Sequence, residues 1–520
     1  MLSALVFAPL VGALILCLVP RENKQALRYL ALLFSLVPVV LVGAMWARFD
    51  FSTSGMQFVE KVPWIPSIGV TYYLGTDGIS FPMLIVTVLV TTLAILASFT
   101  IEERVKEFMA LMLLLETGML GVFVALDYFL FYIFWELVLV PMYFIIGIWG
   151  GPRKEYAAIK FFIYTLAGSV LMLVGILALY FRTGLNTFDI LAIAEQAKAK
   201  LSPSLQYWIF LLLFFGFAVK VPIFPFHTWL PDAHVEAPTG GSMLLAGVLL
   251  KMGTYGFYRI SYPTLPDAAR AFAVVMGVLG VINIVYGALV AMAQQDFKKM
   301  VAYSSIGHMG FVLLGLAAMT PMAMDGGLFV MVSHGLISPL MFFFAGSVIY
   351  ERTHTRMLNE MRALFTRIPI AATLLAVAAF ANLGLPGLSG FVGEFFTLVG
   401  AFPVLPRFVY VAVLGMVFTA AYHLWMMNRI LMGTTVAHAA AHGHHGHGGH
   451  GSGHDHGDHG GHGAGEQEAP MPDIQPREVL VVAPLVALVV LFGVAPSILV
   501  RMFNPSVQAL LERLGGLVAP

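Results

Sequence analysis

The sequence predicts an all-α membrane protein with about fourteen transmembrane helices. Composition supports this fold class, because 59% of the 520 residues are hydrophobic, only 11% are charged, and the mean hydropathy is +0.87. A spanning helix needs about 20 apolar residues, and the chain divides into stretches of about that length. These stretches leave no room for a sizeable soluble domain, so a soluble enzyme is excluded.

The expected spans follow one another along most of the chain. The first, residues 2–19, lacks a basic leading segment and a small-residue cleavage site, so we interpret it as a retained span rather than a signal peptide. The other expected spans are residues 28–47, 79–100, 108–126, 129–149, 158–181, 206–226, 240–261, 269–293, 301–319, 327–350, 368–400, 407–431 and 478–500. Three connections are long, at residues 48–78, 182–205 and 432–477. The C-terminal tail is expected to form a short amphipathic helix at the membrane interface.

Basic residues predict how these spans are oriented. Loops after odd-numbered spans carry 16 Lys and Arg residues and the opposite loops carry 10, Arg259 among them. Since Lys and Arg accumulate in cytoplasmic loops, we expect the first set to be cytoplasmic and both termini to lie outside. Subtracting these 26 from the total of 28 leaves Lys220 and Lys251 inside spans. Acidic and basic residues are equal in number, so no net charge indicates a nucleic-acid partner.

Two expected spans are broken in a similar way. FAVKVPIFPF places Pro222 and Pro225 within the seventh span, and LGLPGLSG places Pro386 and its neighbouring glycines within the twelfth. Each proline removes a backbone donor and frees a carbonyl, so these breaks must face protein or water rather than lipid. The breaks are five spans apart, and an odd number inverts the topology, which predicts two inverted five-helix repeats. The alternative is that prolines are simply common in membrane helices.

The repeats predict five regions along the chain. Residues 1–107 hold the first three helices, 108–261 the first repeat and 262–432 the second repeat. Residues 433–477 form a His/Gly-rich cytoplasmic loop, and 478–520 hold the last transmembrane helix and the tail. Matched broken helices in such repeats point to a transport site between them.

Four ionisable side chains lie deep within expected spans: Glu136, Lys220, Lys251 and Glu394. An acidic or basic residue at that depth costs about 2.5–3.5 kcal/mol, so each needs a partner, a proton or water. Static ion pairs that stabilise helix packing are the alternative interpretation. However, buried ion pairs are often no better for stability than apolar replacements. Four such residues on four spans therefore favour a path for protons or ions.

Histidines provide candidate intermediate positions on this path. His308 and His334 lie on spans between the two broken helices, and His227 and His423 are secondary candidates. Imidazole titrates near neutral pH and can accept a proton on one nitrogen while donating from the other. Any one of these histidines alone is more often a packing residue. Combined with the glutamates and lysines, His308 and His334 are predicted to be functional.

A low-complexity segment and the single cysteine add little chemistry. The loop after the thirteenth expected span holds ten of the 16 histidines, and residues such as His444, His445 and His447 could bind metal weakly. Its Gly/His composition cannot fix a coordination geometry, so we interpret it as a dispensable loop. Cys17 alone cannot form an intramolecular disulfide, a thiolate zinc site or an iron-sulfur site.

Four motifs carry a resemblance to a known family. They are WELVLVPMYFIIGIWG (135–150), GFAVKVPIFPFHTWLPDAHVEAPTGGSMLLAGVLLKMGTYG (216–256), DFKKMVAYSSIGHMGF (296–311) and LPGLSGFVGEF (385–395). Together they resemble the antiporter-like membrane subunits of respiratory complex I, in the form found in chain M. The resemblance covers essentially the whole chain, and the related chains L and N generally carry lysine where this sequence has Glu394. The His-rich loop departs from the family pattern but leaves the motifs intact.

The resemblance implies roles for the embedded residues. It pairs Glu136 with Lys220, makes Lys251 the central lysine and Glu394 the terminal acid, and links them through His308 and His334. It implies a proton-translocating subunit of an NADH:quinone oxidoreductase in the bacterial inner membrane, with other membrane-arm subunits as partners, including chains L and N. This chain is expected to bind no cofactor, and flavin, iron-sulfur clusters and quinone are expected in partner subunits. The alternatives are a subunit of an Mrp-type cation/proton antiporter or of a membrane-bound hydrogenase.

Overall fold

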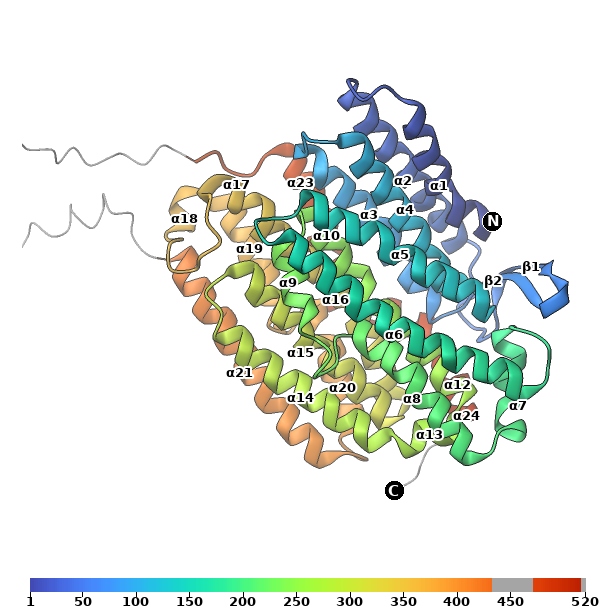
Figure 1. The fold of residues 1–520 in the computed structure, drawn as a ribbon. Coiled ribbons are helices and arrows are strands. Elements are labelled where there is room, and N and C mark those ends of the chain that lie inside the picture. The colour runs from blue at the N-terminus through green and yellow to red at the C-terminus, as the bar shows by residue number, and fades with distance from the viewer. Residues whose placement is uncertain (433–470, 516–520) are drawn as a thin grey trace, which may run out of the picture.

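The computed structural model describes residues 1–432 and 471–515, and these fold into a mostly helical protein (Figure 1). Eleven helices in the described residues are long and apolar enough to cross a membrane. They are α2 (Lys24–Trp46), α3 (Ser80–Ala97), α4 (Val105–Val124), α5 (Tyr128–Trp149), α6 (Lys154–Thr183), α8 (Pro203–Lys220), α14 (Ala273–Met292), α15 (Phe297–Ala318), α16 (Pro321–Phe343), α21 (Pro406–Leu431) and α23 (Pro476–Val494). The expected helical membrane architecture is therefore confirmed.

The other three expected spans are apolar but shorter or interrupted, so their crossing remains a prediction. The first is α1 (Leu2–Leu18), which has 17 residues. The eighth is divided by two π-helical turns into α10 (Thr239–Leu244), η3 (Leu245–Leu249), α11 (Leu250–Gly256), η4 (Phe257–Ser261) and α12 (Tyr262–Thr264). The twelfth is divided into α19 (Pro369–Asn382) and α20 (Ser389–Ala401).

Both expected helix breaks are confirmed. Helix α8 ends at Lys220, and the chain turns before the short helix α9 (Trp229–Glu236). Asn283 of α14 satisfies the backbone at this break, because its side chain accepts from the Phe224 N–H (2.9 Å) and donates to the Pro222 carbonyl (3.3 Å). The freed backbone groups thus face protein, as the absence of water in lipid requires.

The first long connection contains a β-hairpin, which the all-α expectation did not include. Strand β1 (Gln57–Ile65) pairs antiparallel with β2 (Val70–Thr76), joined by η1 (Pro66–Ile68) and Gly69 at a φ of 71°. Strand β2 bridges to Ala125, and Asp127 bridges to Asp189 just before helix α7 (Ile190–Lys200). The amphipathic tail is helix α24 (Ser497–Arg513), whose Ser506 hydroxyl accepts from the Gly78 N–H.

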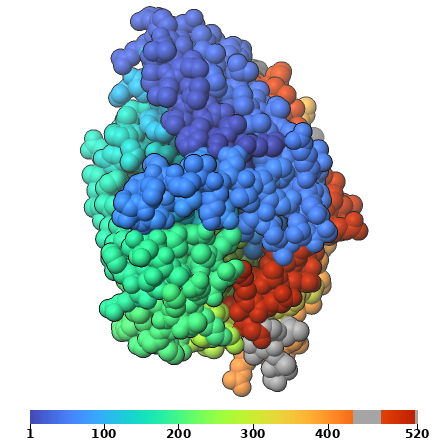
Figure 2. Space-filling model, turned by 90° about the vertical axis from the view of Figure 1, so that its right-hand side faces the viewer, coloured from blue at the N-terminus to red at the C-terminus, as the bar shows by residue number. Residues whose placement is uncertain are grey.

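These contacts define one end of the helix bundle, which we call the hairpin face: β1, β2, α7 and α24. Figure 2 shows the hairpin region in blue, α7 in green and α24 in red, side by side. The amino group of Met1 pairs with Glu60 of β1, so Met1 and α24 lie at the same face. This agrees with the expected placement of both ends on one side of the membrane, whereas the assignment of this face to the outside remains a prediction.

Contacts at the opposite face join the connections that we expect to be cytoplasmic. Arg21 pairs with Glu107 at 3.0 Å, and hydrogen bonds from Lys24 and Arg28 lower the pKa of Glu102 to about 2. Asp296 bridges to Met357 in the connection that follows α17 (Tyr350–Thr353). One assignment is wrong: Arg259, counted as a loop residue, is buried within η4 and pairs with Asp77. Its charge is satisfied inside the protein, so it says nothing about loop orientation.

The helices of the two expected repeats pack in the same order. In the first, α4 packs on α5, α5 on α6 and α6 on α8. In the second, α14 packs on α15, α15 on α16 and α16 on α20. This recurrence agrees with the expected repeats, whereas the boundaries of the five regions remain predictions. The remaining short helices are η2 (Ser98–Thr100), α13 (Pro266–Ala271), η5 (Phe344–Val348) and α18 (Leu364–Arg367).

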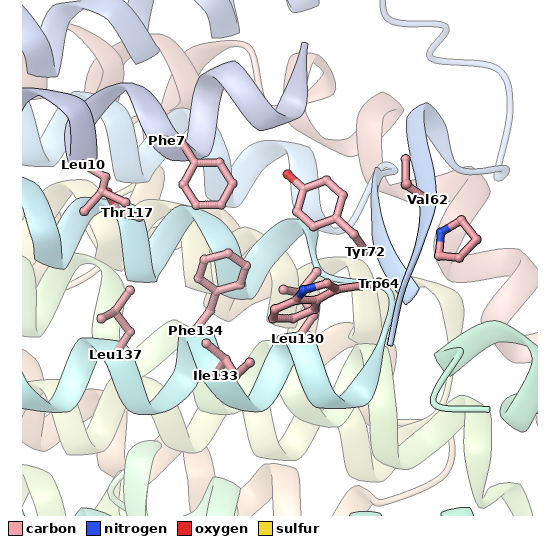
Figure 3. A pocket seen from close by; sticks show the side chains of 11 residues that line it. Phe7, Leu10, Val62, Trp64, Tyr72, Thr117, Leu130, Ile133, Phe134 and Leu137 are labelled. Carbon is pink, nitrogen blue, oxygen red and sulfur yellow. The ribbon is translucent and has the colours of Figure 1, made fainter. Parts of the chain in front are cut away.

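An apolar cavity of about 520 Å³ lies between α1, α5 and the hairpin (Figure 3). Phe7, Trp64, Tyr72 and Phe134 surround it, and Leu10, Leu130 and Leu137 complete much of its wall. No acidic, basic or histidine side chain lines it. A cavity with this lining offers no sites for binding protons, so the functional site must be sought among the buried charged residues.

Candidate proton-transfer site

A connected series of titratable side chains joins Lys251, near the end of the first repeat, to three residues of the second repeat. The Lys251 ammonium donates to His334 Nδ1 at 2.5 Å, and His308 Nδ1 donates to Glu394 Oε1 at 2.8 Å. The rings of His334 and His308 lie 5.4 Å apart between centroids. All four side chains are buried, with exposed fractions of 1–7%. The structure therefore brings together four of the six predicted path residues.

Each of the two histidines leaves one ring nitrogen without a partner beside a shared small cavity. Because His334 Nδ1 accepts from Lys251, a neutral His334 carries its hydrogen on Nε2. Because His308 Nδ1 donates to Glu394, its Nε2 is free to accept. Both Nε2 atoms are buried without a partner, and both residues line a cavity of about 10 Å³. A cavity of that size accommodates about one water molecule, which could connect the donor to the acceptor.

A π-helical turn positions Lys251. The turn η3 ends one residue before α11 begins, and the Ala246 carbonyl accepts from the Lys251 ammonium at 2.5 Å. Widening a helix to the π form leaves carbonyls without their usual backbone donors, and such turns are frequent at functional sites. The local backbone thus supplies an acceptor that directs the ammonium toward His334.

The break in the twelfth span positions Glu394. Its second oxygen, Oε2, would lie 3.1 Å from a Cβ added at Gly384, and Gly384 has a φ of +83°. Glycine is therefore required there on two grounds, since a side chain would be strained and would crowd the carboxylate. The LGLPGLSG segment lets the chain pass close to Glu394 and then restarts the helix at Ser389.

The cluster of Glu136 and Lys220 presents a looser arrangement. Lys220 is buried at the end of α8, with its ammonium 5.3 Å from the Trp135 ring centroid and 5.8 Å from that of Phe161. Glu136 is half-buried, and its Oε1 has no hydrogen-bond partner. Among the described residues, no ion pair within 4.0 Å joins Glu136 to Lys220. In this conformation the Lys220 ammonium lies beside two aromatic rings, whose faces attract a cation electrostatically.

The two clusters adjoin through packed backbones. Val221, the residue after Lys220, lies so close to Gly253 that a Cβ at Gly253 would come within 2.6 Å of its side chain. Gly253 follows Lys251 by two residues on α11. The glycine thus lets the broken helix approach the helix that carries Lys251.

The two secondary histidines occupy different environments. His423 has both ring nitrogens satisfied, because Nε2 accepts from Asn382 (2.8 Å) and Nδ1 donates to the Thr419 carbonyl (2.9 Å). That arrangement fits a packing role beside the small cavity, which Asn382 lines. His227 Nε2 shares a hydrogen bond with the Tyr286 hydroxyl at 3.2 Å, and its Nδ1 has no partner.

Several buried titratable residues escaped the sequence interpretation, among them His234, Lys298 and Glu116. His234 of α9 is fully buried, stacks on Phe342 at 4.2 Å, and has no partner at either ring nitrogen. It lies within electrostatic reach of both Lys251 and Lys298. Lys298, counted as a loop residue, is 3% exposed and donates to the Ala237 carbonyl.

Glu116 of α4 is another missed residue. It is fully buried, and neither carboxyl oxygen has a partner. Glu116 lies between Met112 and Phe123 on this helix. The side chain of Met112 lies near Gly240, and the ring centroids of Phe123 and Tyr255 are 5.2 Å apart. This spacing places the carboxyl on the face of α4 that packs on α10 and α11. The signal in the sequence was a glutamate within an expected span, LLLETGML, which the interpretation of embedded charges overlooked.

No group of three or more His, Cys, Asp and Glu side chains in the described residues is arranged to hold a metal ion. His444, His445 and His447 lie outside the described residues. The weak metal binding predicted for that loop therefore remains a prediction.

Comparison with known proteins gives a family for this arrangement. Residues 125–419 match the family described as NADH:quinone oxidoreductase/Mrp antiporter, TM. The chain is 42% identical to NADH-quinone oxidoreductase subunit M of Rhodobacter capsulatus, covering 98% of this chain and 96% of the relative. It is 43% identical to F(420)H(2) dehydrogenase subunit M of Methanosarcina mazei, covering 83% of this chain and 88% of the relative.

A solved structure agrees with these relatives. The structure of respiratory complex I from Thermus thermophilus with bound NADH contains a chain with 30% sequence identity and a TM-score of 0.83, covering 99% of this chain and all of that one. The match thus extends over the three N-terminal helices and α24 as well as the two repeats. The chain belongs to the NADH:quinone oxidoreductase/Mrp antiporter family, as an antiporter-like membrane subunit of the complex I subunit M type.

Proposed function

We propose that this chain translocates protons as a membrane subunit of NADH:quinone oxidoreductase. The observation that carries the proposal is the buried series Lys251, His334, His308 and Glu394, joined by two direct contacts and one small polar cavity. A static packing role accounts poorly for it, because a buried polar series is costly unless every member is satisfied. Here the Nε2 atom of each histidine is buried without a partner.

The proposed direction of transfer begins at the face opposite the hairpin. Lys298 and His234 lie between that face and Lys251, and His234 carries two unpartnered ring nitrogens suited to relaying a proton. The proton passes to Lys251 and along the histidines. Glu394 is the terminal acid of this series.

Glu136 and Lys220 supply the proposed control of this path. Pairing with the Glu136 carboxylate stabilises a charged Lys220, whereas separation in a dry site favours release of the proton toward Lys251. Moving one charge against 100 mV costs about 2.3 kcal/mol, which is within the range that making and breaking one buried ion pair can supply. The unpaired arrangement observed here corresponds to the separated state.

Redox chemistry is proposed to take place in partner subunits that hold flavin, iron-sulfur clusters and quinone. Partners in the membrane are the other membrane-arm subunits, including chains L and N, and the location is the bacterial inner membrane. The names of the relatives and the likeness to a chain of a complex I structure support these assignments. The chain would convert a conformational or electrostatic signal from its partners into proton movement.

The test is to replace Lys251 in the whole complex. Lys251→Leu should assemble and bind its partners, and proton translocation during quinone reduction in proteoliposomes should fall about a hundredfold. Lys200→Ala, which removes an exposed lysine of α7, serves as the matched control and should pump as wild type. Normal pumping by Lys251→Leu would refute the proposed function. Purification without a flavin and iron-sulfur arm would instead favour an Mrp-type antiporter.

A second candidate is the same membrane module with a different electron donor. The 43% identity to F(420)H(2) dehydrogenase subunit M favours it, because that relative carries a different donor in its name. Membranes containing the complex can be supplied with NADH or with reduced F420 in parallel. The donor that drives proton uptake identifies the complex, and the roles proposed for the buried residues are the same in both cases.

A further inference from the structure

The small cavity beside His308 and His334 has a further polar residue in its wall. Asn382, the last residue of α19, lines this cavity of about 10 Å³ together with the two histidines. Its side chain is buried at the point where the twelfth expected span breaks. The mechanism described above uses the histidines but assigns no role to Asn382.

Two neighbouring helices hold the amide group of Asn382. Its Nδ2 lies 2.8 Å from His423 Nε2 of α21 and 3.3 Å from the Ser304 hydroxyl oxygen of α15. His423 Nδ1 donates to the Thr419 carbonyl, so in the neutral imidazole Nε2 can only accept. The Ser304 hydroxyl donates its hydrogen to the Val301 carbonyl at 2.8 Å, so its oxygen also accepts.

These two acceptors fix the direction in which the amide of Asn382 faces. An asparagine side chain has an NH₂ group with two donors and a carbonyl oxygen that accepts. His423 and Ser304 take both donors, and no hydrogen bond among the described residues uses Oδ1. Oδ1 is therefore the polar group that Asn382 contributes to the cavity wall.

A water molecule in this cavity needs one more acceptor than the histidines provide. It accepts from His334 Nε2 and donates to His308 Nε2, which uses one of its two hydrogens. Buried waters typically make about three hydrogen bonds, and much of the remaining wall is apolar. Oδ1 of Asn382 supplies an acceptor for the second hydrogen.

Ser333 is the other uncharged polar side chain in the wall. Its hydroxyl donates to the Val330 carbonyl of its own helix at 3.3 Å, an arrangement that is common for serine in helices and needs no second partner. Asn382, in contrast, is held from two other helices in a way that leaves its acceptor over. The third hydrogen bond of the water is therefore assigned to Asn382.

We propose that Asn382 is a positioning residue for proton transfer, whose Oδ1 holds the water that joins His334 to His308. The proposal rests on the proposed function and deepens it. A proton from Lys251 arrives at His334 Nδ1, and His334 gives its Nε2 proton to the water. The three hydrogens of the hydronium then have three acceptors, namely His334 Nε2, His308 Nε2 and Asn382 Oδ1. The hydronium gives one proton to His308 Nε2 and becomes water again, so one proton has left Lys251 and one has reached His308.

Replacement of the amide tests the third hydrogen bond in the intact complex. Asn382→Leu has a side chain of similar size and should lower the rate of proton translocation in proteoliposomes about tenfold, because the water loses an acceptor. Gln206→Leu removes another buried amide, near the start of α8, and should pump as wild type. Ser333→Ala should lose much less than Asn382→Leu. The reverse order of these two losses would overturn the assignment to Asn382.

Two variants of His423 separate positioning from packing and from proton relay. His423→Gln can still accept from the Asn382 amide through its side-chain oxygen, so it should retain most of the translocation. His423→Phe keeps a ring but offers no acceptor, so the amide is free to turn and translocation should fall about as far as in Asn382→Leu. Wild-type translocation by His423→Phe would show that His423 only packs, and an equal loss in both variants would show that it titrates. Either result would overturn the proposal.

The water itself can be observed without measuring activity. A cryo-electron microscopy map of the intact complex that resolves waters should show a peak within about 2.7–3.2 Å of His334 Nε2, His308 Nε2 and Asn382 Oδ1. The same peak should be absent from Asn382→Leu. A wild-type peak that contacts Ser333 instead of Asn382, or no peak in this cavity, would contradict the proposal.

The outcomes separate this inference from the proposed function. If Asn382→Leu pumps normally while Lys251→Leu does not, Asn382 does not position the water and the proposed function stands. If Lys251→Leu pumps normally, the proposed function itself fails.

Discussion

The two clusters of buried charges are held in different ways. In the Lys251–Glu394 series, which joins the end of the first repeat to the second repeat, Lys251 contacts His334 and His308 contacts Glu394 at hydrogen-bond distance. In the Glu136–Lys220 cluster of the first repeat, Lys220 lies against the rings of Trp135 and Phe161, and Glu136 leaves one carboxyl oxygen without a partner. The difference fits the proposed roles, in which the Lys251–Glu394 series conducts protons and the Glu136–Lys220 cluster controls them.

This division has a physical reason. A buried series conducts only if neighbouring donors and acceptors are within reach, which the Lys251–Glu394 series provides. A switch needs two arrangements of similar free energy, and contacts with aromatic rings offer a cation an alternative to its carboxylate partner. The predictions below test that difference between the two clusters.

The largest effect is expected at Lys220. Lys220→Ala should abolish proton translocation and depress coupled quinone reduction while the complex still assembles, because only a titratable cation at the helix break can exchange protons. Proton uptake and quinone reduction measured in the same proteoliposomes provide the check. Normal pumping by the variant would mean that the Glu136–Lys220 cluster does not control the path.

Glu136 should tolerate a shorter acid better than an amide. Glu136→Gln should resemble Lys220→Ala, since the switch loses its charge. Glu136→Asp keeps the charge and should retain partial pumping. Equal pumping by the two variants, measured as protons per quinone reduced, would contradict a role for the negative charge.

Glu394 is expected to give a smaller loss than Lys220, because it ends the series rather than controlling it. Glu394→Gln should slow proton release and lower coupled activity. Glu394→Lys should fold but fail to restore coupling, because a second cation would face the positively charged end of the same series at Lys251. Wild-type pumping by Glu394→Gln would remove this residue from the path.

The smallest effect is expected for the His-rich loop. Deletion of residues 437–465 should leave assembly and pumping nearly unchanged, since a Gly/His segment cannot bury a core and lies outside both clusters. Turnover and pumping of the deleted complex should be measured with and without added zinc. Loss of turnover, or its restoration by zinc, would show a metal-dependent role for the loop.

Much of the fold could be predicted from the sequence, because a bilayer imposes simple rules on span length and backbone satisfaction. The broken helices were found from the prolines and glycines of FAVKVPIFPF and LGLPGLSG, and the four embedded charges from hydropathy. The β-hairpin was missed because it lies in a connection outside the membrane, where those rules do not apply. Its signal was the β-branched and aromatic run VTYYLGT of β2.

The geometry of the site could not be predicted. Whether Glu136 touches Lys220 depends on a fraction of a helical turn and on side-chain rotamers, which periodicity does not specify. The π turns before Lys251 and around Arg259 shift the register of a helix that the pattern treats as regular. His234 was missed because a histidine in a short helix after a break cannot be placed near Lys251 without tertiary contacts.

The central claim is that the Glu136–Lys220 cluster and the Lys251–Glu394 series form one path, and a double variant tests it most directly. Protons translocated per quinone reduced should be measured in wild type, in Glu136→Asp, in Glu394→Gln and in the variant with both changes. If both residues act on one path, the double variant should lose no more than the worse single variant, because residues that act as a unit are not additive. Losses that combine independently would show two separate functions and contradict the account.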